Sequence, residues 1–288
     1  MRLKPAVLVA ACALMCLVPA SALAHKAPTT KPAPSYYLAL GDSLAAGAQP
    51  NTAGKTLPTN QGYANDLLAS QKSKVKGLKL KDLGCVGETT TSMLSGGKFC
   101  PYVGTQLADA VTFIKTHKIA FVTLDIGAND VDRCASVPAT QLVPCVEAGL
   151  ATINQNVPKI VQKLRHAAGR KVTIVGMTYY DPFLADWVST PPNQPLATES
   201  VALSTALNGD LTKAFTAQKL RIADVATAFD TYTPFTRTTT LAGHGTVPLA
   251  VAQICTFTWM CAAAPRGPNI HANAQGYHKI AAVFAAKL

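Results

Sequence analysis

The chain has 288 residues, of which 49% are hydrophobic, and 26 Lys and Arg residues outweigh 15 Asp and Glu, for a formal net charge of +11. This length suits one α/β domain with a sizeable core. The basic residues are scattered apart from a lysine cluster at 72–81, whose end alternates with leucines like the solvated face of a strand. Since no aromatic-rich basic motif is present, we expect no nucleic-acid partner.

Residues 1–24 have the pattern of a secretory signal peptide: Arg2 and Lys4 precede an apolar run at 6–18, and an A-x-A cleavage pattern follows. The apolar run is too short for a membrane span, and no later stretch approaches one. We therefore expect a secreted, extracellular protein without an integral membrane segment. An alternative is a lipoprotein, because the sequence VAAC ending at Cys12 superficially resembles a lipid-attachment site.

Six cysteines remain after the predicted cleavage, and an even count in an exported chain indicates disulfide bonds. The simplest hypothesis pairs sequence neighbours: Cys85 with Cys100, Cys134 with Cys145, and Cys255 with Cys261. A zinc site is the rival interpretation, but the chain has no C-x-x-C motif and no His at ligand spacing beside a cysteine pair. We expect no metal and no other cofactor.

After a Pro/Thr/Lys-rich lead-in at 25–35, short apolar runs alternate with segments of helical periodicity. The apolar runs predict strands at 36–41, 78–84, 119–127, 172–178 and 220–225. The periodic segments predict helices at 60–71, 105–117, 146–168, 196–217 and 273–287. This alternation is typical of a parallel sheet with helices on both faces, here as a single domain over 36–288. The Pro/Thr/Ala-rich stretches 181–200 and 226–265 predict long loops over one edge of the sheet.

Reactive side chains follow the predicted strands, where ligands bind in such folds. Ser43 follows the first strand, Gly87 the second and Asn129 the third, while His271 precedes the last helix. Each has a simpler interpretation by itself: helix caps for Ser43, Asn129 and His271, and a turn glycine for Gly87. Together they supply a serine nucleophile, a base and oxyanion donors, and removing one such donor typically costs about 2.7–4 kcal/mol.

Four blocks of sequence that contain these residues resemble the SGNH, or GDSL-motif, hydrolase family. They are ALGDSLAAG, GCVGETT, DIGAND and IHANAQGYHKIA. The resemblance covers most of the chain after residue 35, and the tail and six cysteines are most similar to the secreted bacterial lipase and esterase branch. It implies a flavodoxin-like three-layer α/β/α sandwich around a five-stranded parallel sheet. It also implies Ser43 as nucleophile, His271 as general base, and an oxyanion hole made by Ser43, Gly87 and Asn129.

The chain departs from this family at the acid that usually stands three residues before the histidine. Pro268 occupies that position, and no acid lies nearby in the sequence. One interpretation is a Ser–His dyad whose His271 is oriented by a main-chain carbonyl around 266–269, and this is our prediction. A second is an inactive relative that binds without turnover. A third is a distant acid, Asp125 or Asp181, that folds in beside the histidine.

The resulting hypothesis is a secreted serine esterase or lipase that acts as a monomer on a small-molecule or lipid ester. A carbohydrate acetyl esterase and an inactive binding protein with the same fold are the alternatives. The acyl group stays open, since Phe183, Leu184 and Trp187 could line an acyl slot or belong to the core. A different α/β-hydrolase is disfavoured, because no G-x-S-x-G motif is present.

Overall fold

The computed structural model describes residues 1, 34–97, 100, 102 and 104–288. The predicted signal peptide and nearly all of the predicted lead-in therefore lie outside the described residues. Within the described part of the chain, no helix is long and apolar enough to cross a membrane.

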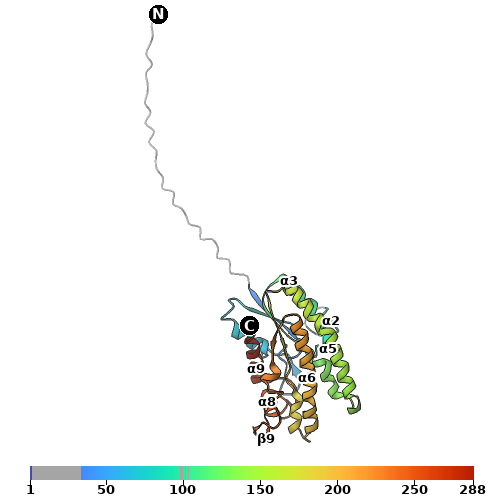
Figure 1. Cartoon of the computed structure of the whole chain (residues 1–288). Helices are drawn as coiled ribbons and strands as arrows, with labels where there is room; N and C mark the ends of the chain where they lie inside the picture. Colours follow the sequence, from blue (N-terminus) through green and yellow to red (C-terminus); the bar gives the residue numbers. More distant parts are fainter. Residues whose placement is uncertain (2–33, 98–99, 101, 103) are drawn as a thin grey trace, which may run out of the picture. The chain divides into compact units, whose positions relative to one another are not determined.

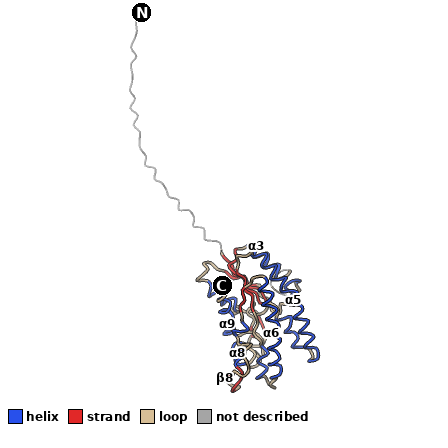
Figure 2. The backbone as a smooth tube through the Cα atoms, in the orientation of Figure 1, coloured by secondary structure: helices blue, strands red, loops and turns tan. Residues whose placement is uncertain are grey.

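A five-stranded parallel sheet forms the centre of the fold (Figures 1 and 2). Its strands, in spatial order, are β4 (Lys79–Asp82), β1 (Ser35–Gly41), β5 (Lys118–Asp125), β6 (Thr173–Met177) and β7 (Arg221–Ala223). Adjacent strands pair in parallel throughout. Numbered along the chain, this order is 2-1-3-4-5, which is the order of flavodoxin-like folds.

Helices cover both faces of the sheet, as Figure 1 shows. On one face α1 (Tyr63–Gln71) packs against α9 (Ala274–Ala285). On the other, α5 (Ala139–Ala168) lies between α3 (Gln106–Thr116) and α6 (Gln194–Ala217) and contacts both. The three layers confirm the predicted α/β/α sandwich, and all five predicted strands and all five predicted helices are present.

Helix α5 is longer than its apolar pattern predicts. The buried stripe that predicted it, including Ile153, Val157 and Leu164, lies within 146–168, but the helix begins seven residues earlier at Ala139. The extra turns contain Pro144 and bury few side chains, so they carry little apolar periodicity.

The predicted long loops at 181–200 and 226–265 are wrong, because both stretches contain short regular elements. They hold the 3-10 helix η2 (Pro182–Val188), the first turns of α6, α7 from residue 226 on (Val225–Ala228), the hairpin of β8 (Thr238–Leu241) and β9 (Gly245–Pro248), and α8 (Leu249–Phe257). Tertiary packing stabilises them: Trp187 stacks on Phe235 with ring centroids 5.1 Å apart. Proline in the first turn of α6 is compatible with a helix, so composition alone was misleading.

Short elements complete the edge where the sheet strands end. They are the two-residue strands β2 (Gln49–Pro50) and β3 (Thr56–Leu57), the helices α2 (Thr90–Ser95) and α4 (Ala128–Asp132), and the 3-10 helix η1 (Arg133–Ser136). Disulfide bonds join Cys85 to Cys100, Cys134 to Cys145, and Cys255 to Cys261, which confirms the predicted pairing of sequence neighbours.

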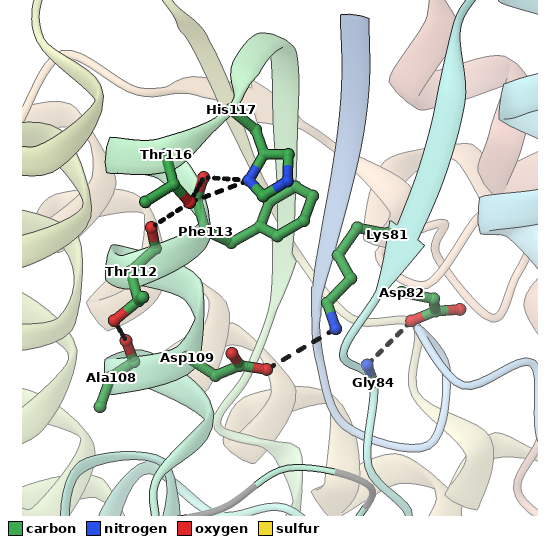
Figure 3. Close-up of polar contacts among 9 residues, drawn as sticks. All are labelled: Lys81, Asp82, Gly84, Ala108, Asp109, Thr112, Phe113, Thr116 and His117. Atoms are coloured by element: carbon green, nitrogen blue, oxygen red, sulfur yellow. Dashed lines mark hydrogen bonds and ion pairs between the residues drawn. The ribbon is translucent and has the colours of Figure 1, made fainter. Parts of the chain in front are cut away.

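Polar contacts along the β4 edge are shown in Figure 3. Lys81 Nζ lies 3.8 Å from Asp109 Oδ2 of α3, and both side chains are about one-third exposed. Such surface pairs typically contribute only about 0–1 kcal/mol. The apolar face of α3, with Leu107, Ala110 and Ile114 buried, therefore contributes more to holding this helix against the sheet.

Candidate active site

Two carboxyl groups anchor the turn that carries Ser43. The backbone N–H of Leu44 donates to Asp42 Oδ1 at 2.9 Å, and that of Ala45 donates to Asp125 Oδ2 at 3.1 Å. The Asp42 N–H also donates to the main-chain oxygen of Asp125 at 3.1 Å. These bonds tie the turn after β1 to the end of β5, and they hold Ser43 in a nearly buried position, 7% exposed.

Gly41 precedes this turn at a point where no side chain fits. Its φ is +143°, and an added Cβ would lie 2.1 Å from the main-chain oxygen of Asp125. The side-chain amide of Gln106 bonds both backbone groups of Gly41, accepting from its N–H and donating to its carbonyl, each at 2.8 Å. The glycine before the Asp-Ser pair is therefore required by the close approach of β5.

Asp42 and Asp125 form a buried pair. Tyr179 donates its hydroxyl to Asp42 Oδ2 at 2.6 Å, and Tyr63 donates to Asp125 Oδ1. Burial raises the pKa of both carboxyl groups, and the neighbouring Asp42 charge adds to the increase in the pKa of Asp125. The hydrogen bonds of Asp125 go to Tyr63 and the serine turn rather than to His271.

A hydrogen bond joins the segments that contain Gly87 and Asn129. Gly87 sits in the turn after β4 with φ +75°, and Asn129 lies in the first turn of α4. Asn129 Nδ2 donates to the main-chain oxygen of Glu88 at 2.9 Å, which leaves its second N–H for another acceptor. The backbone N–H groups of Ser43 and Gly87 have no hydrogen-bond acceptor among the described residues.

Several backbone bonds hold the loop that presents His271. The Trp259 N–H donates to the His271 carbonyl at 3.0 Å, and the Tyr180 hydroxyl donates to the carbonyl of Ile270 at 2.7 Å. An isolated antiparallel bridge joins Thr258 to Ala272. His271 is 8% exposed and lines the same cavity as Ser43 and Asn129.

The acceptor beside His271 is a side-chain amide. Nδ1 of His271 lies 2.7 Å from Oδ1 of Asn269, so the prediction of a main-chain carbonyl is wrong. The alternative acid Asp181 is also engaged elsewhere, since its Oδ1 accepts from the Phe183 N–H at the start of η2. The sequence signal that could have found Asn269 is the spacing N-x-H, because Asn side chains commonly bond the backbone two residues on.

Burial without a neighbouring charge sets the protonation of the histidine. It lowers the pKa of His271 to about 4, from an ordinary value of about 6.5. The imidazole is therefore neutral at pH 7, which is the form that can accept a proton.

An apolar cavity of about 350 Å³ extends from these residues toward α5 and α6. Its wall includes the apolar side chains Leu142, Val146, Leu150, Phe183, Leu196, Leu203 and Leu207. Of the three residues considered for an acyl slot, Phe183 lines the cavity, whereas Leu184 is a core residue and Trp187 packs on Phe235.

The carboxyl groups of Asp132 and Asp181 also line the cavity, which the sequence did not indicate. Burial raises the pKa of Asp132 to about 8, with contributions from the charges of Asp42 and Asp181. Burial likewise raises the pKa of Asp181 to about 6, and the hydrogen bond from the Phe183 N–H partly offsets this increase. At neutral pH the half-buried Asp132 is therefore mostly uncharged.

The 2-1-3-4-5 sandwich, with a serine turn at the strand ends and a cavity beside it, defines an α/β protein with a site at the carboxyl edge of its sheet. The sequence model of the GDSL-like Lipase/Acylhydrolase family matches residues 39–279, and the chain belongs to this family. No curated protein sequence matches the chain.

Solved structures with the same fold include several ester hydrolases. Phospholipase A1 from Streptomyces albidoflavus NA297 has a TM-score of 0.60 and 17% identity, covering 89% of this chain and 100% of that one. The extracellular lipase from Streptomyces rimosus has a TM-score of 0.58 and 17% identity, with coverage of 88% and 100%. Axe2, an acetylxylan esterase from Geobacillus stearothermophilus, has a TM-score of 0.51 and 15% identity, with coverage of 88% and 94%. At these identities the likeness shows the fold alone.

Proposed function

We propose that the protein is a secreted carboxylic ester hydrolase that works through an acyl-enzyme on Ser43. The observation that carries the proposal is the convergence of Ser43, Asn129 and a neutral His271 on one apolar cavity, from segments far apart in the sequence. Membership of a lipase/acylhydrolase family supports it. The predicted signal peptide and three disulfide bonds support action outside the cell, where such bonds persist. The monomeric state stays a prediction.

In the proposed first step, His271 Nε2 accepts the proton of the Ser43 hydroxyl while Oγ bonds to the ester carbonyl carbon. The carbonyl oxygen becomes an oxyanion, and the donors available to it are the N–H groups of Ser43 and Gly87 and the amide of Asn129. Collapse of this intermediate breaks the bond to the alcohol, which takes the proton from His271. Water then repeats the sequence on the acyl-serine and releases the acid.

The cavity favours a substrate with an apolar acyl chain over an acetylated sugar. Its volume of about 350 Å³ lies within the range of small-molecule sites, about 300–1,000 Å³. Its wall includes six aliphatic side chains from α5 and α6, which can bury methylene groups. We therefore expect kcat/KM on p-nitrophenyl esters to rise from C2 toward longer acyl chains, whereas a carbohydrate acetyl esterase would prefer C2.

The first prediction concerns the nucleophile. Ser43→Ala should abolish ester hydrolysis while leaving the fold intact by circular dichroism, because no other hydroxyl is proposed to form the acyl-enzyme. A fluorophosphonate probe should label the parent chain at Ser43, as read by peptide mass spectrometry, and should not label the variant. Full activity of Ser43→Ala would contradict the assignment. A folded parent that neither reacts nor turns over would instead support an inactive binding protein.

A further inference from the structure

The side chain of Asn269 is the acceptor beside the imidazole, and it lies one residue after Pro268, the position at which the family resemblance implies an acid. We propose that Asn269 is a positioning residue that fixes His271 as the Nδ1–H tautomer and so leaves Nε2 available as the base. This inference rests on the proposed function. It assigns to a neutral side chain the tautomer control that an acid provides in a Ser-His-Asp triad.

The backbone determines which way the Asn269 amide points. The main-chain N–H of His271 lies 3.1 Å from Asn269 Oδ1. A backbone N–H can only donate, so the side-chain atom that it faces must be the carbonyl oxygen and not the NH₂ group. The orientation of this amide therefore follows from the donor it meets.

The amide in turn determines the tautomer of the imidazole. The same Oδ1 lies 2.7 Å from His271 Nδ1. An amide oxygen can only accept, so Nδ1 must carry the proton. In a neutral imidazole the other nitrogen, Nε2, then holds the lone pair, and this is the nitrogen that a serine hydroxyl needs as a base.

Contacts from a distant segment hold Asn269 in place. Its Nδ2 donates to Thr56 Oγ1 at 2.9 Å, across 213 positions of sequence, and its backbone N–H donates to the Trp259 carbonyl at 3.2 Å. Gly267, two residues earlier, packs so closely that an added Cβ would lie 2.0 Å from the Ala262 carbonyl oxygen. Asn269 is thus held by hydrogen bonds of both its side chain and its backbone, which is what a positioning residue requires.

Because Asn269 is neutral, the charged imidazolium form of His271 has no carboxylate partner at Nδ1. The titratable groups that share the cavity are Asp42, Asp132, Asp181, Tyr179 and Tyr180. None of them hydrogen bonds to the imidazole, and Tyr180 bonds the neighbouring carbonyl of Ile270 instead. His271 therefore meets an amide dipole rather than a carboxylate, in keeping with a pKa that burial lowers to about 4.

The second prediction tests this role with Asn269→Asp, Asn269→Leu and the control Thr56→Val. Asn269→Asp keeps an acceptor and adds a negative charge, which should raise the pKa of His271. The acid limb of the pH profile of kcat/KM should therefore move up by about 1–3 pH units. Asn269→Leu removes the acceptor at similar size, so kcat should fall by about 10²-fold, as for a misplaced catalytic group, with little change in KM. Thr56→Val removes the hydrogen bond from Asn269 Nδ2 but adds no charge and leaves the His271 N–H on Oδ1, so the acid limb of its pH profile should match the parent, and its kcat should fall less than that of Asn269→Leu.

Nitrogen NMR of the ¹⁵N-histidine-labelled chain gives a readout that does not depend on turnover. His271→Gln identifies the signal by its loss, and the parent signal should show a protonated Nδ1 and an unprotonated Nε2 at pH 7. An Nε2–H tautomer, or identical acid limbs for the parent and Asn269→Asp, would overturn the proposal even if Asn269→Leu failed to fold. If the NMR spectrum shows the Nδ1–H tautomer but the fluorophosphonate probe does not react with Ser43, only the hydrolase assignment is rejected.

Discussion

At the scale of single residues, burial and neighbouring groups decide the chemistry of ordinary side chains. Burial lowers the pKa of His271 and raises the pKa of Asp132, so both groups are mostly uncharged at neutral pH. Asp42 and Asp125 share a buried environment in which burial and the Asp42 charge raise the pKa of Asp125, and both carboxyl groups accept hydrogen bonds from the serine turn. The candidate site therefore places an uncharged imidazole and carboxyl groups of raised pKa near Ser43.

The third prediction concerns the pH dependence that Asp132 introduces. Its carboxyl group is neutral below a pKa of about 8, so above this pH a charge appears on the wall of the apolar cavity. We expect kcat/KM on long-chain esters to fall above about pH 8, while an acetyl ester is affected less. Asp132→Asn should remove the difference between the two substrates, and an unchanged alkaline profile in this variant would contradict the assignment.

The raised pKa of Asp132 also makes the free energy of unfolding depend on pH. The pKa of Asp132 is about 8 in the folded chain and about 3.9 when unfolded. The folded state therefore binds the extra proton between these values. The stabilisation from this proton is full below about pH 4 and is lost as the pH rises through about 8. Urea unfolding from pH 4 to 9 should consequently show a weaker pH dependence for Asp132→Asn than for the parent.

At the scale of elements, the cavity depends on the first turns of α5 and on the middle of α6. Leu142 and Val146 of α5 face Leu203 and Leu207 of α6 across it. Pattern analysis found the buried core stripe of α5 but not its first turns, since these line a cavity rather than a packed core. Under the proposed function, these side chains would limit which acyl chains fit.

The fourth prediction fills this cavity. Leu142→Trp should lower kcat/KM for long-chain esters by about tenfold relative to acetyl esters, because displacing two methylenes forfeits about 0.8 kcal/mol each. Val143→Trp is the matched control: this neighbouring side chain is 61% exposed and does not line the cavity. Chain-length profiles of both variants, with melting temperatures, provide the test. An equal loss at every chain length in Leu142→Trp would contradict the proposed acyl site.

At the scale of the whole molecule, strand order assembles the site. Because β1 lies between β4 and β5, the segments that follow these three strands are neighbours at one edge of the sheet. Ser43, Gly87 and Asn129 belong to those segments, and the connection from α8 to α9 brings His271. Disulfide bonds anchor three of the surrounding segments, after β4, at η1 and after α8.

The fifth prediction concerns one of these bonds. Replacing Cys134 and Cys145 by Ala should destabilise the chain by about 2–4 kcal/mol and lower its Tm by about 2–4 °C per kcal/mol. Scanning calorimetry measures the change, and thiol titration of the denatured parent checks that no cysteine in the bond is reduced. An unchanged Tm would show that this bond does not stabilise the folded state.

Sequence alone determined the elements with strong local signals, and it indicated the residues that are proposed to carry the chemistry. Apolar runs located the five sheet strands, and the blocks around Ser43, Gly87, Asn129 and His271 indicated the family. The tertiary structure alone decided strand order, the cavity and the partner of His271. These depend on contacts between distant segments, such as the bond from Asn269 to Thr56 across 213 positions, and local periodicity carries no information about such contacts.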